Sequence, residues 1–92
     1  MSLTDVSVVI VNYNTPDLTL ACISSVIEKT QGVDYEIIVV DNASPDCDPK
    51  LFTEKFPSVK LIVSKENGGF AKGNNLGLSI ASGRYILSLI HI

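Results

Sequence analysis

The chain has 92 residues, 46% of them hydrophobic and 18% charged, with 10 acidic side chains against 7 basic ones and a net charge of −3. This length suits one compact domain, so we treat residues 1–92 as a single domain, and the apolar content excludes an intrinsically disordered chain. The acidic balance argues against a nucleic-acid-binding protein, which normally carries a basic stripe, and we expect no nucleic acid partner.

Neither a membrane-spanning helix nor a signal peptide is predicted. The longest apolar runs, 8–11 and 37–40, hold four residues each, whereas a spanning helix needs about 20. The first residues, 1–5, contain no basic segment that leads into an apolar stretch. Cys22 and Cys47 lack the spacing of a metal site and predict two reduced thiols. Together these features predict a cytoplasmic protein.

The first part of the chain combines an apolar run with a helical pattern. The β-branched run 6–11 predicts a strand that is covered on both faces. Thr15 and Pro16 then predict an N-cap and the first position of a helix, and Gly32 marks the exit from it. The apolar side chains of this helix recur at helical spacing, at Leu20, Ile23 and Ile27.

The middle of the chain repeats this alternation. Residues 35–40 predict a second buried strand, which ends in the polar turn 41–46. A short helix begins at Asp48-Pro49 and stops at Pro57. Residues 59–63 then predict a third strand.

The last part predicts a third helix over 70–82, Gly83 beyond its end, and a fourth strand over 84–90. Strands that alternate with helices are typical of a parallel sheet with right-handed crossovers. We therefore expect an α/β protein with three layers, α/β/α, a mostly parallel sheet of strand order 3-2-1-4 and a Rossmann-like architecture.

Asn and Asp residues gather where the predicted strands end. The segment 12–14 follows the first strand, Asp41 and Asn42 follow the second, and Asn67 lies just past the third. In open α/β sheets ligands bind at this carboxyl edge, beside the point where the strand order reverses, here between the first and fourth strands. The alternative is that these residues only form turns through side-chain hydrogen bonds to the backbone.

Glycines recur every four residues along the third predicted helix, at Gly69, Gly73 and Gly77. Each costs roughly 0.8–1 kcal/mol against alanine inside a helix, so the spacing needs a reason. Close packing of the helix on the sheet is one explanation, and close approach of a phosphate-bearing ligand to backbone N–H groups is another. Lys72 is the one basic side chain on this helix, and it either stays solvated or faces such a ligand.

Several common motifs are excluded. No G-x-G-x-x-G sequence occurs, so the dinucleotide-binding fingerprint is absent. Gly68 and Gly73 have the glycine spacing of a P-loop, but Asn74 follows where that motif requires lysine. Asp46 and Asp48 suggest a calcium loop, whose glycine and closing glutamate are missing. The chain therefore matches none of these sites.

Three segments, 6–14, 38–44 and 67–77, resemble the family 2 glycosyltransferases, which are inverting enzymes of the GT-A fold. The segments come in the family's order and spacing, and the resemblance covers about residues 5–89. Their variants Val-Asn-Tyr-Asn, Asp-Asn-Ala-Ser and Gly-Phe-Ala-Lys-Gly-Asn-Asn are most similar to a branch with rhamnosyltransferase-like members. The resemblance implies the N-terminal, nucleotide-binding half of a GT-A domain.

The resemblance also implies a set of nucleotide-binding residues: Val11, Asn12, Tyr13, Asn14, Asp41, Asn42, Asn67, Gly69, Lys72 and Gly73. Asp41 would accept a hydrogen bond from the base, and a carboxylate, which can only accept, suits the imide N–H of uracil or thymine. Many relatives place an arginine at the position of Asn74, so Lys72 would serve the diphosphate instead.

Strand 4 of the family leads into an acidic motif that holds Mg²⁺ or Mn²⁺ against the diphosphate. The matching positions here, 90–92, carry no carboxylate. We therefore expect no metal ligand and no catalytic residue in this chain, and a truncated domain that is inactive alone.

The intact enzyme would move a sugar from a dTDP- or UDP-linked donor to a glycan hydroxyl with inversion, in polysaccharide biosynthesis at the cytoplasmic face of the membrane. Two alternatives are a nucleotidyltransferase and a non-enzymatic interaction module. A nucleotidyltransferase usually has a glycine-rich loop after its first strand, which 12–16 is not. Whatever the function, we expect a homodimer through the incomplete edge of the sheet.

Overall fold

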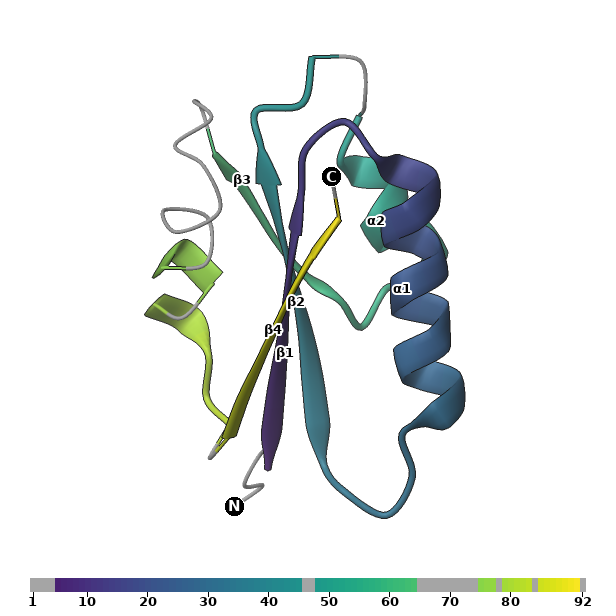
Figure 1. Cartoon of the computed structure of the whole chain (residues 1–92), viewed down its shortest axis with the longest axis vertical. Helices are drawn as coiled ribbons and strands as arrows, with labels where there is room; N and C mark the ends of the chain where they lie inside the picture. Colours follow the sequence, from purple (N-terminus) through teal and green to yellow (C-terminus); the bar gives the residue numbers. More distant parts are fainter. Residues whose placement is uncertain (1–4, 46–47, 65–74, 78, 84, 92) are drawn as a thin grey trace.

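The computed structural model of the chain describes residues 5–45, 48–64, 75–77, 79–83 and 85–91. Its elements, in chain order, are β1 (Val6–Asn12), α1 (Pro16–Lys29), β2 (Tyr35–Asn42), α2 (Lys50–Lys55), β3 (Lys60–Ser64) and β4 (Tyr85–His91). The strands form one parallel sheet of order β3-β2-β1-β4, which confirms the predicted topology. Figure 1 shows α1 and α2 on one face of this sheet and the helical residues 75–77 and 79–80 on the other.

The core lies on β1 and β2 because these central strands are covered on both faces. Val8 and Ile10 face α1 and α2, where Ile23 and Phe52 are fully buried. Val9 packs on the opposite face in a second cluster, which Leu76 and Ala81 help to cover. The three-layer α/β/α architecture predicted from the sequence is therefore confirmed.

Some predicted boundaries were wrong by one or two residues. Asn12 lies inside β1 and Asp41 and Asn42 lie inside β2, because the parallel ladder continues to the pair Asn12↔Asp41. Ile27, predicted on the apolar stripe of α1, is 38% exposed. The buried residues of this helix are Thr19 and Ile23. The first half of the third predicted helix, 70–74, lies outside the described residues.

Gly77 shows why the third helical segment carries a glycine. A Cβ at this position would overlap Cγ1 of Val9 and lie 3.4 Å from Cγ2 of Val40. The backbone of this segment therefore rests directly on the sheet, as the packing explanation predicts. Gly69 and Gly73, for which a phosphate contact was the other explanation, lie outside the described part of the chain.

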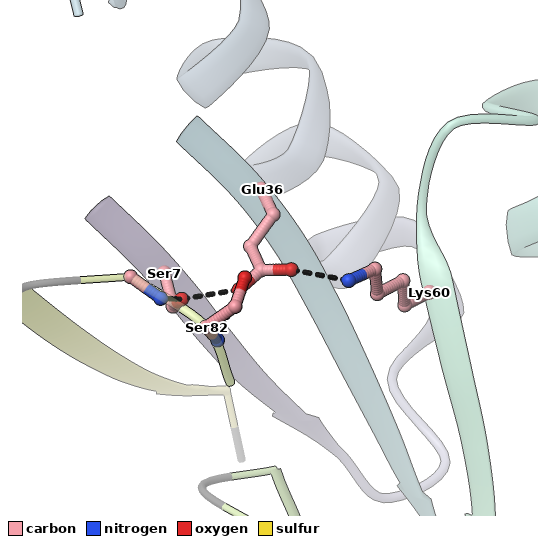
Figure 2. Close-up of polar contacts among 5 residues, drawn as sticks. Ser7, Glu36, Lys60 and Ser82 are labelled. Carbon is pink, nitrogen blue, oxygen red and sulfur yellow. Dashed lines mark hydrogen bonds and ion pairs between the residues drawn. The ribbon is translucent and has the colours of Figure 1, made fainter. Parts of the chain in front are cut away.

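A carboxylate of β2 joins β1, β3 and the segment before β4 at the amino edge of the sheet (Figure 2). Glu36 of β2 accepts hydrogen bonds from Ser7 of β1 at 2.5 Å and from the backbone N–H of Ser82, just before β4, at 2.7 Å. Lys60 of β3 forms an ion pair with it at 2.5 Å. Partial burial alone would raise the pKa of Glu36, but the Lys60, Ser7 and Ser82 hydrogen bonds outweigh it and lower this pKa from 4.5 to about 2.

We expect Glu36 to make the stability of the fold depend on acid pH. A carboxyl whose pKa is lower in the folded state stabilises the fold above its unfolded pKa, so this contribution is present above pH 4.5 and is lost as the pH falls towards 2. Because the Lys60 side chain is 51% exposed, screening by solvent limits the contribution to about 1–2 kcal/mol. Urea unfolding from pH 7 to pH 2 should show Glu36→Gln less stable at pH 7 and less sensitive to acid.

The matched control is Glu54→Gln, which removes one negative charge from the exposed surface of α2. Identical pH profiles for Glu36→Gln and the unmodified chain would contradict a stabilising role of this carboxylate.

The outer edge of β4 carries exposed apolar side chains. Tyr85, Ile86 and Leu87 are 65%, 43% and 49% exposed, and β4 pairs with β1 alone within the part of the chain that the structure describes.

Cys22 on α1 is a free cysteine, and burial raises the pKa of its thiol, while Cys47 lies outside the described residues. Among the described helices, none has the length and apolar content to cross a membrane.

Candidate functional site

Asn12 and Asp41 meet at the carboxyl edge of the sheet, where the two central strands end. They are register partners although 29 positions separate them, and Nδ2 of Asn12 donates a hydrogen bond to Oδ1 of Asp41 at 2.8 Å. Asn12 is 0% exposed and Asp41 is 2% exposed. A buried carboxylate therefore lies at the edge where open α/β sheets bind ligands.

Both the oxygen and the nitrogen of the Asn12 side-chain amide form hydrogen bonds within the protein. Its Oδ1 accepts hydrogen bonds from the hydroxyls of Thr19 at 2.7 Å and Thr15 at 3.2 Å, and its Nδ2 also donates to Ser44 Oγ at 3.2 Å. Two acceptor positions and two N–H groups are thus all engaged within the protein. Thr15, the N-cap of α1, makes no side-chain cap bond, and its hydroxyl donates to Asn12.

Ser44 connects the loops that follow the two strands. Its hydroxyl donates to Asp41 Oδ1 at 2.6 Å and accepts from the backbone N–H of Asn14 at 2.7 Å. On each side of this contact one residue has a left-handed backbone, Asn14 with φ 54° and Ala43 with φ 59°. Such a conformation is unfavourable for alanine, and residues that adopt it are found more often at functional sites than elsewhere.

The two oxygens of Asp41 have different surroundings. Oδ1 accepts from Asn12 Nδ2 and Ser44 Oγ, whereas Oδ2 accepts from the Ser44 backbone N–H at 3.3 Å, a long hydrogen bond. Within the described residues Oδ2 is therefore the oxygen with capacity for a further donor. The site can accept an N–H or O–H group from a ligand at this atom.

Sequence reasoning missed Ser44 and Thr19 as parts of this site. Ser44 had a weak signal, because an aspartate side chain in a turn commonly accepts a hydrogen bond from a backbone N–H a few residues further on. Thr19 lies four positions before Ile23, on the same buried face of α1. A polar side chain on a buried face is normally hydrogen-bonded, so its position indicated a buried hydrogen bond. Both signals point to contacts inside the protein and not to a ligand.

The remaining predicted residues divide between buried, exposed and undescribed positions. Val11 and Asn42 are each 2% exposed in the strands, while Tyr13 is 43% exposed directly after β1. The structure thus brings the residues from β1, from β2 and from the loop after β1 to one edge. The predicted residues Asn67, Gly69, Lys72 and Gly73 lie outside the described part of the chain.

The described residues do not fit a Mg²⁺ or Mn²⁺ site. They contain no group of three His, Cys, Asp or Glu side chains that could hold a metal ion. The buried carboxylate of Asp41 has its Oδ1 engaged by Asn12 and Ser44.

Comparison with known proteins gives the family. The chain matches the family described as Glycosyl transferase family 2 over residues 7–89. It is 35% identical over 86 residues to "Minor teichoic acid biosynthesis protein GgaB" of Bacillus subtilis (strain 168), with 89% of this chain and 10% of that protein covered. It is 36% identical over 86 residues to "Succinoglycan biosynthesis protein ExoO" of Rhizobium meliloti (strain 1021), with 92% of this chain and 24% of that protein covered.

A third relative, "Poly(ribitol-phosphate) beta-glucosyltransferase" of Bacillus spizizenii (strain ATCC 23059 / NRRL B-14472 / W23), is 37% identical over 87 residues, with 89% of this chain and 14% of that protein covered. The chain thus spans 10% to 24% of the length of these relatives. Because the family match extends over nearly the whole chain and agrees with the parallel α/β sheet, the chain belongs to glycosyl transferase family 2.

Proposed function

We propose that this chain binds the nucleoside of a nucleoside-diphosphate sugar at the carboxyl edge of β1 and β2. Asp41 accepts the imide N–H of uracil or thymine at its Oδ2, since a carboxylate can only accept hydrogen bonds. Tyr13, a half-exposed aromatic residue beside it, packs against the base or ribose. The observation that carries the proposal is the Asn12–Asp41 hydrogen bond of 2.8 Å at the ends of the two central strands.

The residues of the site have different roles in this proposal. Asn12 is fully buried and its amide is engaged within the protein. It therefore positions Asp41 and does not make the direct nucleotide contact expected from the sequence. Val11 and Asn42 are buried near the ends of β1 and β2, and Asn14 is exposed in the loop after β1. By family resemblance, the residues that contact the ribose and the diphosphate are Asn67, Gly69, Lys72 and Gly73.

The longer protein would transfer a sugar from a dTDP- or UDP-linked donor to the hydroxyl of a glycan, with inversion and with Mg²⁺ or Mn²⁺ bound elsewhere. More specifically, we propose that its preference for a donor resembles that of rhamnosyltransferase-like members of the family. Support comes from the names of relatives in teichoic acid and succinoglycan biosynthesis. The setting we propose is the cytoplasmic face of the membrane, and this chain alone supplies nucleotide binding without catalysis.

A second copy of the chain is the partner we propose for the outer edge of β4. An edge strand with three exposed apolar side chains, Tyr85, Ile86 and Leu87, can pair antiparallel with its own copy about a two-fold axis. A monomer in sedimentation velocity at rising concentration would contradict this pairing.

Calorimetric titration of UDP, dTDP and GDP into the chain, with and without Mn²⁺, tests the proposed function. We expect saturable, weak binding of UDP and dTDP, with a Kd of roughly 0.1–1 mM, weaker binding of GDP and no dependence on Mn²⁺. No binding of any of the three nucleotides would contradict the proposal and favour an interaction module. Tight binding that requires Mn²⁺ would show that this chain holds the metal.

A further inference from the structure

We propose that Ser44 is a positioning residue that aims Asp41 at the ligand and thereby sets the preference for bases with an imide N–H. This inference rests on the proposed function, because it assigns the cause of base selectivity within the same site. Ser44 itself does not contact the ligand. Its hydroxyl acts through the carboxylate, to which it donates a hydrogen bond of 2.6 Å.

The hydrogen-bonding capacity of the Ser44 hydroxyl is fully used within the protein. It donates to Asp41 Oδ1 and accepts from the backbone N–H of Asn14 at 2.7 Å and from Asn12 Nδ2 at 3.2 Å. A hydroxyl offers one donor and two acceptor positions, so none is left for a ligand. The contribution of Ser44 to binding must therefore be indirect.

These contacts fix the rotation of the Asp41 carboxyl group. Asn12 and Ser44 both hold Oδ1, while the Ser44 backbone N–H approaches Oδ2 at the longer distance of 3.3 Å. Rotation about the Cβ–Cγ bond would break the two shorter hydrogen bonds together. The same oxygen, Oδ2, is therefore held towards an incoming donor before the ligand arrives, which is preorganisation of a recognition group.

Ser44 also fixes the position of the loop after β1 relative to the loop after β2. The hydrogen bond from the Asn14 N–H crosses between loops that are 30 positions apart in sequence. Asn14 and Ala43 both take left-handed conformations beside it, which the surrounding contacts must maintain. Tyr13 precedes Asn14, so the Ser44 hydroxyl fixes the backbone next to Tyr13 relative to the carboxylate of Asp41.

Loss of the hydroxyl should reduce selectivity for the imide N–H and not only overall affinity. In Ser44→Ala the Asn14 N–H loses its acceptor, and Oδ1 of Asp41 keeps a single side-chain donor, Asn12. The carboxyl group can then rotate, and its oxygens no longer have distinct roles. A general loosening of the fold would weaken every ligand alike, whereas this change weakens ligands that donate to Oδ2 more than ligands that do not.

The test compares UDP with N3-methyl-UDP, which lacks the imide N–H. In calorimetric titrations we expect the unmodified chain to favour UDP by about tenfold or more, the effect of one hydrogen bond to a charged group. In Ser44→Ala this ratio should fall below about threefold. Ser44→Thr, which keeps a hydroxyl, should restore the ratio, and thermal unfolding of each variant reports whether the fold is retained.

The outcomes separate this inference from the proposed function. A chain that binds neither nucleotide, or binds both equally, contradicts the Asp41–base contact itself. Discrimination in the unmodified chain that persists unchanged in Ser44→Ala overturns the role of Ser44 alone. If Ser44→Ala does not fold, Ser44→Cys is the second variant, because its thiol is a far weaker donor and acceptor than a hydroxyl. The ratio should then fall below that of the unmodified chain, and an unchanged ratio overturns the inference in the same way.

Discussion

Replacing Gly83 by alanine should destabilise the chain strongly, although the substitution adds only one methyl group. A Cβ at Gly83 would lie 2.5 Å from the backbone nitrogen of Ser7 and 2.8 Å from the carbonyl carbon of Val6. Backbone atoms of a central strand cannot move aside as a flexible side chain can, so the segment before β4 must withdraw from β1. Two hydrogen bonds would then be lost, one from the Gly83 N–H to Ser7 Oγ of β1 at 2.8 Å and one from the Tyr85 N–H, at the start of β4, to the carbonyl of Asp5, just before β1, at 2.9 Å.

Overpacking of this kind, with hydrogen bonds lost, should lower the free energy of unfolding by about 3 kcal/mol. For a domain of this size that corresponds to a fall in Tm of roughly 12–24 °C. Gly32→Ala is the matched control: no atom lies within 4 Å of its Cβ position, and its φ of +78° makes the substitution cost about 1 kcal/mol. A Gly83→Ala chain that melts at or above the temperature of Gly32→Ala would contradict the close contact between this segment and β1.

The strand order and the meeting of Asn12 with Asp41 could be predicted because they follow from local patterns. β-branched runs fix the strands, the helical patterns between them impose parallel crossovers, and the carboxyl ends of parallel strands share one edge. Asn12 and Asp41 are polar residues at the ends of two such runs. That they lie side by side in the structure follows from the pairing of β1 with β2.

The hydrogen bonds that shape the site could not be predicted in the same way. The contact between Ser44 and Asn14 depends on a left-handed backbone at Ala43, and nothing in an alanine indicates a positive φ. The Glu36 cluster depends on the register of β2 with β3 and on the approach of Ser82, 46 positions away. Such contacts arise from tertiary packing, which propensities and spacing do not encode.

Asp41→Asn should remove most of the nucleotide affinity while it leaves the shape of the site unchanged. An asparagine can keep its Oδ1 as acceptor for Asn12 and Ser44, which places its Nδ2 where Asp41 now has Oδ2. At that point an N–H group would face the Ser44 N–H and the imide N–H of the base, so donors would oppose donors. Loss of a hydrogen bond to a charged group costs about 1.5–3 kcal/mol, or roughly 10- to 150-fold in Kd.

Glu28→Gln is the control for this substitution. It makes the same change from carboxylate to amide on an exposed residue near the end of α1, which runs back to the amino edge of the sheet, away from the site (Figure 1). We expect it to bind UDP as the unmodified chain does, and thermal unfolding of both variants reports that each is folded at the temperature of the titration.

The most direct measurement is therefore the UDP affinity of Asp41→Asn relative to Glu28→Gln, obtained by titration of folded samples in the same buffer. We expect a Kd at least about tenfold higher for Asp41→Asn. Equal affinities for the two variants would contradict the proposed site, because the nucleoside would then bind elsewhere than at the Asn12–Asp41 edge.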